Sequence, residues 1–344
     1  MSAGTVESTA RGRELRARRR SGVIGVLIAL VVLAFAATLM IGQTFYPPGD
    51  VVRVILGQEV PGASFTVGRL RLPRAALAVV AGLSFGLAGI TFQTLLRNPL
   101  ASPDIIGISS GASAAATFAI VLLSLGQTGV SVFAVAAGLL VAVLMYVLSY
   151  KNGVSGTRLI LIGIGIAAML DSVTYYVLDQ AAAWEFQEAM RWLTGSLNGA
   201  TWEESVLASA ALLVIGSVLL SQSASLSMIQ LGDETAAALG VRVNVVRLVA
   251  ITGAVGLIAF ATAAAGPIAF VSFLSGPIAA RIVGPNGSLL VPSALIGALL
   301  VLVADFCGQF AFGTRYPVGV VTGVLGAPYL VYLIVRANRA GHSL

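Results

Sequence analysis

Three arginines near residue 70 form a candidate site for recognising an acidic partner. Arg71 and Arg74 are three residues apart, so they share one face of a helical turn, and Arg69 lies just before them. Guanidinium groups pair readily with carboxylates, so the cluster predicts docking of an acidic protein. The alternative is that these side chains extend to anionic lipid head groups or to neighbouring loops.

Two carboxylates, Asp171 and Asp305, fall inside apolar segments, where ionisable groups are rare and mark ion or proton pathways. Each is a candidate proton carrier, although a hydrogen-bonded residue that faces other helices is the simpler interpretation. An ion-coupled carrier needs a relay of such groups. The scarcity of these groups therefore argues against that class.

Other reactive groups are sparse. Cys307 lies inside an apolar segment, and His342 lies in a polar tail, so neither predicts a disulfide or a metal site. The sequence contains no metal-binding cluster and no GxxxxGK[ST] phosphate loop. We expect no cofactor on this chain, and ATP with Mg²⁺ would have to bind a partner.

A polar segment at about 225–244 separates two apolar runs. Asp233 and Glu234 are predicted in the first turn of a short helix, where negative charge complements the helix dipole, and Gly240 is predicted to end it. A short exposed helix suits insertion into a groove of a soluble partner. On the pattern alone, an ordinary connector is an equal alternative.

These residues are set in an apolar chain. Hydrophobic residues make up 58% of the 344 residues, and the mean hydropathy is +0.96, which excludes a water-soluble globule. A helix crosses the hydrocarbon core with about 20 residues. We predict an all-α polytopic membrane protein with ten helices, at 22–42, 75–96, 105–125, 129–149, 159–178, 204–221, 245–265, 267–283, 289–310 and 317–335. Eight or nine helices is the alternative count, because the sixth and eighth segments are short and Pro277 interrupts the eighth.

The basic residues predict the orientation. With the N-terminus inside, 14 of the 20 Lys and Arg residues fall on the inner side, as the positive-inside rule requires. We predict a basic cytoplasmic tail at 1–21, a membrane domain at 22–336 and a cytoplasmic tail at 337–344, all in the cell membrane. The first apolar run is long for a secretory signal and lacks a clear cleavage site, so we expect an uncleaved helix.

Five pieces of the sequence, in order, resemble the FecCD-type permeases. These permeases are membrane subunits of binding-protein-dependent ABC importers for iron-siderophore complexes, haem and vitamin B12. The resemblance runs from about residue 45 to 336. The pieces are RLPR at 71–74, Gln93 with RNPLASPD at 97–104, LGDETAAALGV at 231–241, AGPIAFVSF at 265–273, and YPVGVVTGVLGAPYLVYL at 316–333.

The resemblance implies a ten-helix fold, a second permease subunit, two cytoplasmic ATPase subunits and an external substrate-binding protein. By position, Arg71 and Arg74 match arginines that receive acidic residues of the binding protein. The cytoplasmic gate matches Asn98, Leu100 and Thr157. The segment that seats in the ATPase matches Leu231, Gly232, Asp233, Glu234, Ala238, Leu239 and Gly240.

The chain also departs from the family pattern. GPI at 276–278 and PNGS at 285–288 stand where many members carry histidines, which favours a branch away from the vitamin B12 type. A further outer arginine of some members aligns near Gln309, and Arg315 stands where an acidic residue is common. We therefore assign Arg315 as a replacement docking charge.

These observations predict the permease subunit of an ATP-driven importer, with ferric siderophores as cargo and alternating access as the mechanism. The alternatives are haem or cobalamin as cargo, or an ion-coupled secondary transporter. The sequence does not decide which chelate is carried, or whether the second subunit is a copy of this chain or a relative.

Overall fold

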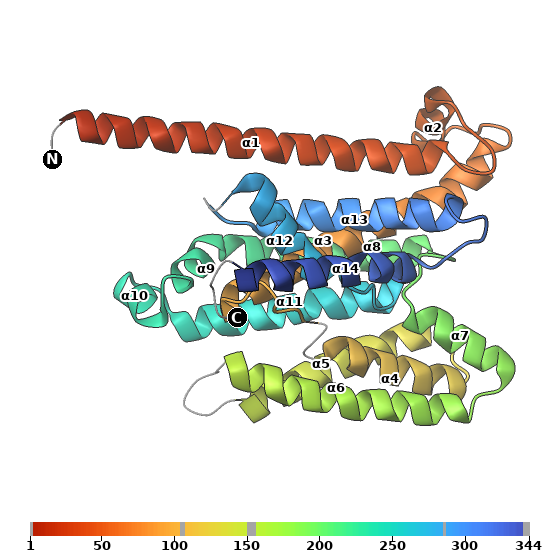
Figure 1. Ribbon diagram of the computed structural model, residues 1–344. Helices are drawn as coiled ribbons and strands as arrows, with labels where there is room; N and C mark the ends of the chain where they lie inside the picture. Colours follow the sequence, from red (N-terminus) through yellow and green to blue (C-terminus); the bar gives the residue numbers. More distant parts are fainter. Residues whose placement is uncertain (1–2, 104–106, 150–155, 285–286, 340–344) are drawn as a thin grey trace.

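The computed structural model describes residues 3–103, 107–149, 156–284 and 287–339. Within these ranges the chain forms helices and turns, and no strand occurs. Most helices run along one common direction and form a bundle (Figure 1).

The helices follow one another in a simple order along the chain. They are α1 (Ala3–Met40), α2 (Pro48–Ile55), the π-helix η1 (Ser64–Arg71), α3 (Leu72–Leu96), α4 (Ile108–Val121), α5 (Gln127–Ser149), α6 (Gly156–Asp179), α7 (Ala183–Leu193), α8 (Trp202–Ser221), α9 (Ser223–Ile229), α10 (Asp233–Ala238), α11 (Val243–Ala265), α12 (Val271–Val283), α13 (Leu290–Phe310) and α14 (Val318–Arg339).

Each of the ten predicted spans coincides with a helix. Among the described residues, seven helical segments are long and apolar enough to cross a membrane by length and composition. The remaining three predicted spans correspond to the shorter apolar helices α4, α12 and α14. The first helix begins at Ala3, so α1 extends through most of the predicted tail at 1–21.

The bundle has two distinct ends. Figure 1 shows α2 and α7 at one end, and α9 and α10 at the other. The first turns of α1 and the last turns of α14 lie at the α10 end. The start of α1 and the end of α14 therefore lie at the same end of the bundle.

Helix α3 occupies the centre of the bundle, where it packs against α8, α11, α12 and α13. Its close contacts depend on glycine. A Cβ atom at Gly86 would lie 2.3 Å from the carbonyl oxygen of Ser293, and one at Gly89 would lie 1.9 Å from that of Ser272. Small residues let helix backbones approach closely in lipid, and here they set the separation of α3 from α12 and α13.

The predicted interruption of the eighth helix at Pro277 is wrong, because the break lies earlier in the chain. Helix α11 ends at Ala265, a turn covers 266–270, and α12 then continues through Pro277 to Val283. The break therefore lies before α12. A neighbouring side chain explains how α12 tolerates its proline, as described below.

Candidate functional site

The arginines predicted to dock a partner surround one pocket at the α2 end of the bundle. This pocket has a volume of about 800 Å³ and is lined by residues from the ends of η1, α3 and α13 and from the 197–202 turn. We call it the arginine pocket, because its basic members are Arg69, Arg71, Arg74 and Arg315.

Arg71 is held by the end of α1. Its guanidinium donates hydrogen bonds to the carbonyl oxygens of Leu39 (2.8 Å), Met40 (3.1 Å) and Thr44 (2.8 Å). It also stacks on Tyr46, with 5.2 Å between the guanidinium carbon and the ring centroid. Because the last carbonyls of a helix lack intrahelical donors, Arg71 acts as a C-terminal cap that joins α1 to η1.

Arg74 is held by Asp305 of α13. Two nitrogens of Arg74, Nε and Nη2, donate to the two carboxylate oxygens at 2.9 and 2.7 Å, and the side chains are only 17% and 4% exposed. Asn198 and Gln309 complete the group, since Arg74 also donates to Asn198 and Gln309 donates to Asp305 at 2.8 Å. Asp305, one of the two candidate proton carriers, is thus a buried member of an ion pair.

Arg69 and Arg315 differ from these two residues. Both are exposed, and neither forms a hydrogen bond or ion pair in the part of the chain that the structure describes. The structure therefore separates two arginines that hold helices together from two whose guanidinium groups are open. The sequence placed Arg69 in the candidate cluster, whereas the family resemblance assigned docking to Arg71 and Arg74, with Arg315 as a replacement charge.

The predicted gate residues Asn98 and Leu100 lie in a tight turn at the opposite end of α3. The Asn98 side chain accepts a hydrogen bond from the Leu100 N–H at 2.8 Å, and its carbonyl accepts one from the Ala101 N–H at 3.1 Å. Thr157, the third predicted gate residue, falls in the first turn of α6, and its side chain lies outside the described part.

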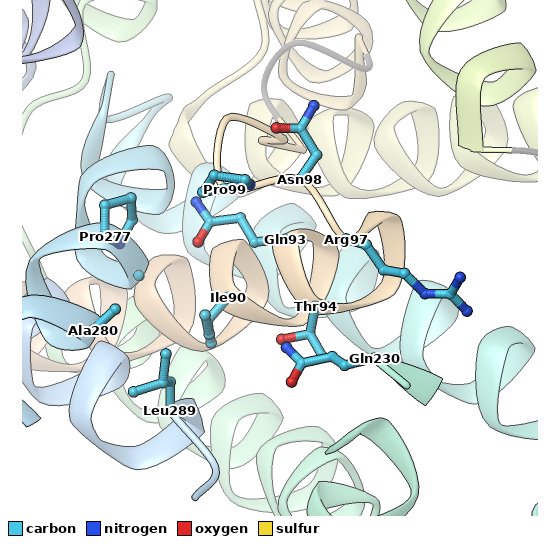
Figure 2. A pocket seen from close by; sticks show the side chains of 11 residues that line it. Ile90, Gln93, Thr94, Arg97, Asn98, Pro99, Gln230, Pro277, Ala280 and Leu289 are labelled. Carbon is cyan, nitrogen blue, oxygen red and sulfur yellow. The ribbon is translucent and has the colours of Figure 1, made fainter. Parts of the chain in front are cut away.

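A cavity of about 300 Å³ adjoins this turn. Residues of α3 and its following turn line one side, and residues of α12 line the other, with Gln230 completing the wall (Figure 2). In Figure 2, Gln93 lies near Pro277 on one side, whereas the Arg97 side chain extends away from them.

Gln93 repairs the helix defect that Pro277 creates. Proline has no N–H, so the carbonyl of Phe273, four residues earlier, loses its donor within α12. The Gln93 side chain donates to that carbonyl at 3.0 Å, and Gly276 leaves the space that Gln93 occupies. A buried glutamine from α3 therefore stabilises a proline-containing helix next to the gate turn.

The predicted short helix in the 231–241 segment is present as α10. Gly232 precedes it, and Gly240 follows it with φ +87°. The Gly240 N–H donates to the Ala237 carbonyl at 2.9 Å, and the Val241 N–H donates to the Ala236 carbonyl at 3.0 Å, which is a Schellman motif.

The tip of this segment is apolar and exposed. Leu231 and Leu239 are 66% and 58% exposed, and Glu234 and Ala238 are also exposed. Exposed leucines that flank a short helix at the end of a bundle are suited to contact a partner.

Asp233 joins the end of α3 to α11. Its carboxylate pairs with Arg97, at the end of α3, and accepts a hydrogen bond from Arg247 of α11 at 2.9 Å. We call Arg97, Asp233 and Arg247 the Asp233 cluster. Burial acts to raise the pKa of Asp233, but the hydrogen bond and charge of Arg247, followed by those of Arg97, hold it below the ordinary value of 3.8.

Comparison with known proteins places the chain in a family. The model of the FecCD transport family matches residues 29–336. The chain belongs to the FecCD transport family. Similar proteins include the achromobactin transport system permease protein CbrC of Dickeya dadantii, at 36% identity over 92% of both chains. The ferric enterobactin transport system permease protein FepG of Escherichia coli is 37% identical over 91% of this chain and 96% of FepG.

A solved structure agrees with the fold of this FecCD chain. It is titled as an inward-facing conformation of an ABC transporter assigned to the metal-chelate type, and it matches with a TM-score of 0.82 and 27% identity. The match covers 92% of this chain and 99% of the other. Together with the apolar helices, membership of the FecCD family identifies a multi-pass membrane protein.

The predicted residues of this FecCD chain are thus gathered at two ends of one bundle. The ion pair between Arg74 and Asp305 and the link between Arg97 and Asp233 were missed by sequence reasoning, because their partners are far apart in the chain. One signal was available, since charged residues within or beside membrane spans generally pair with each other. Asp171 remains different: it is exposed on α6 and has no ion pair among the described residues.

Proposed function

We propose that this chain is the membrane-spanning permease subunit of an ATP-driven importer for ferric siderophores. The observation that carries the proposal is the match to the FecCD family over most of the chain. The names of CbrC and FepG refer to achromobactin and ferric enterobactin transport, which supports a siderophore as the cargo class. The assembly would contain a second permease subunit, two cytoplasmic ATPase subunits and an external binding protein.

The arginine pocket is the proposed docking site of the binding protein. Arg69 and Arg315 present open guanidinium groups that acidic side chains of a partner can reach. Arg71 and Arg74, which match the docking arginines of the family, are already bonded within the chain. In this proposal they shape the pocket and contribute positive potential, while Arg69 and Arg315 make the new contacts.

The α10 end of the bundle is the proposed cytoplasmic end. Docking of the binding protein and closure of the ATP-bound ATPases would move the 231–241 segment, whose exposed leucines contact the ATPase. That movement would open or close the gate formed by Asn98, Leu100 and Thr157. The cargo would pass between two permease subunits, and no covalent chemistry is assigned to this chain.

Transport into vesicles tests the proposal. The chain is reconstituted with its ATPase and binding protein, and uptake of radiolabelled ferric siderophores, haem and cobalamin is measured with and without internal ATP. We expect uptake of a ferric siderophore that requires internal ATP. ATP-dependent uptake of haem or cobalamin alone would contradict the assignment of a ferric siderophore as the cargo. Uptake driven by a proton gradient without ATP would contradict the assignment as an ATP-driven importer.

Binding affinity tests the docking site separately. Replacing Arg315 with Glu or Arg69 with Glu reverses a charge in the arginine pocket, so each change should weaken binding of the cognate binding protein by about tenfold or more. Arg53→Glu is the matched control, because Arg53 is an exposed arginine of α2 outside the pocket. Equal affinities for the wild type and both pocket variants would contradict this site.

A further inference from the structure

Arg97 adopts a backbone conformation that normally favours glycine. It ends α3 with φ +50° and ψ +32°, the left-handed region. The Asn98 N–H donates to the Gln93 carbonyl at 3.1 Å, and the Arg97 N–H donates to the Thr94 carbonyl at 3.4 Å, so α3 closes with a Schellman motif.

The chain uses glycine at the same place elsewhere. Gly240 closes α10 with the same pair of hydrogen bonds. A residue with a Cβ atom in this conformation costs roughly 1–2 kcal/mol relative to glycine. The backbone of α3 would therefore favour glycine at position 97, and the reason for arginine must lie in its side chain.

The Arg97 side chain reaches the segment that contains α10. Its Nε donates to the carbonyl of Ile229, the last residue of α9, at 3.0 Å, and its Nη2 pairs with Asp233. The second oxygen of Asp233 is held by Arg247 at 2.9 Å. One carboxylate thus joins the end of α3, the start of α10 and the first turns of α11.

The ion pair between Arg97 and Asp233 contributes little fixed stability. Arg97 is 42% exposed and Asp233 46% exposed, and exposed ion pairs contribute only about 0.2–1 kcal/mol. Such a gain is no larger than the cost of the left-handed backbone. The ion pair alone therefore does not account for arginine at this position.

Arg97 is also the residue directly before the gate turn. The turn is internally bonded through Asn98, and Ser102 lies 3.1 Å from Ser272 at the start of α12, measured between the hydroxyl oxygens. A displacement of Arg97 is consequently carried into Asn98 and Leu100. The cavity of about 300 Å³ beside Asn98 and Pro99 provides room for such a displacement.

We propose that Arg97 is a positioning residue that transmits movement of the α10 segment to the gate turn through its contacts with Asp233 and Ile229. This inference deepens the proposed function and rests on it. When a partner moves α10, Asp233 and the Ile229 carbonyl move the guanidinium of Arg97. The short turn from Asn98 to Ala101 then changes position relative to α12.

The decisive variant is Arg97→Gly. Glycine suits the left-handed backbone, and this gain offsets the lost contacts of the guanidinium. The melting temperature of the purified complex should therefore change little, whereas the link to α10 is lost. We expect ATP-dependent uptake to fall by tenfold or more in vesicles that contain the permease, ATPase and binding protein. Wild-type uptake in Arg97→Gly would overturn the proposal.

Three further variants separate transmission from local structure. Arg97→Lys keeps the charge and should retain more uptake than Arg97→Gln. Asp179→Asn is the matched control, because Asp179 is an exposed aspartate at the end of α6 and has no ion pair among the described residues. Uptake in this variant should change less than twofold. The effects of Arg97→Gln and Asp233→Asn should not add in the double variant, and fully additive effects would contradict a shared link.

A second measurement does not depend on the cargo. Leu100→Cys is placed in a Cys307→Ser background, and its labelling rate with a maleimide is compared with and without ATP and vanadate. The rate should depend on nucleotide when Arg97 is present and should become independent of nucleotide in Arg97→Gly. A retained nucleotide effect in Arg97→Gly would overturn the link alone, whereas no effect with Arg97 present would overturn the proposed function together with the link.

Discussion

Both ends of the bundle contain an arginine paired with an aspartate, but the two pairs lie in different surroundings. Arg74 and Asp305 are nearly buried and form two short hydrogen bonds, with Asn198 and Gln309 as further partners. The side chains of Arg97 and Asp233 are more than 40% exposed, and the Asp233 carboxylate also pairs with Arg247. A buried pair is costly to open because each charge would lose its partner away from water, whereas an exposed pair can separate into solvent.

This difference predicts which pair separates more easily. The Arg74 pair fixes α3 against α13, whereas the exposed pair of Arg97 and Asp233 opens at lower cost. Four sets of substitutions follow, from the largest expected effect on stability to the smallest.

The largest effect is expected from Asp305→Ala. It leaves Arg74 without its counter-ion, so the folded protein should lose about 3–5 kcal/mol, measured by thermal or denaturant unfolding in detergent. Replacing both residues, in Arg74→Met with Asp305→Leu, should recover much of that loss. Asp171→Asn is the control, since Asp171 is exposed and unpaired among the described residues; a similar loss there would contradict a special role for the buried pair.

An intermediate effect is expected from Gln93→Leu. This change leaves the Phe273 carbonyl of α12 without a donor and should cost about 1–3 kcal/mol in the same unfolding assay. In a Pro277→Ala background the residue at 277 supplies its own N–H. The cost of Gln93→Leu should then fall, and an equal cost in both backgrounds would contradict the proposed repair.

A smaller effect on stability is expected from Gly240→Ala. The backbone angle φ +87° is unfavourable for alanine by roughly 1–2 kcal/mol, and the destabilisation should be confined to α10. Gly240→Pro removes the N–H of the Schellman motif and cannot adopt a positive φ, so the α10 segment should lose its shape. Substrate-stimulated ATP hydrolysis should be lost in Gly240→Pro. Retained stimulation would contradict the coupling assignment of this segment.

The smallest effect is expected for the pair Arg97 and Asp233. A double-mutant cycle on unfolding should give a coupling of about 0.2–1 kcal/mol that weakens at about 1 M salt, because screening acts within roughly 3 Å at that concentration. The coupling between Arg74 and Asp305 should change much less with salt. A salt-insensitive Arg97 coupling would contradict the contrast between the two ends.

The pH dependence of the same cycle has a defined sign. The folded-state pKa of Asp233 lies below its ordinary value of 3.8. The stabilisation that the ionised carboxylate contributes is therefore present above pH 3.8 and is lost as the pH falls through the lowered pKa. The coupling should therefore stay constant between about pH 5 and about pH 8. Loss of the coupling within this interval would show that another group controls the contact.

The sequence predicted most of the local structure because apolar length and turn residues are local signals. Ten apolar runs predicted ten helices, and the spacing of Asp233 and Gly240 predicted α10. The ends of α1 and the continuity of α12 were not predicted. Helical propensity carries α1 beyond the membrane segment, and a side chain from α3 satisfies the carbonyl that Pro277 leaves free.

The sequence by itself determined the class of protein, the family and the residues that surround the two ends of the bundle. Only the tertiary structure decided which of the four arginines of the arginine pocket are already bonded, because their partners lie on α1, on α13 and in the 197–202 turn. It also decided that Arg97 contacts Asp233, 136 residues away. Such partners are fixed by how helices pack across the bundle, and one-dimensional spacing contains no information about that packing.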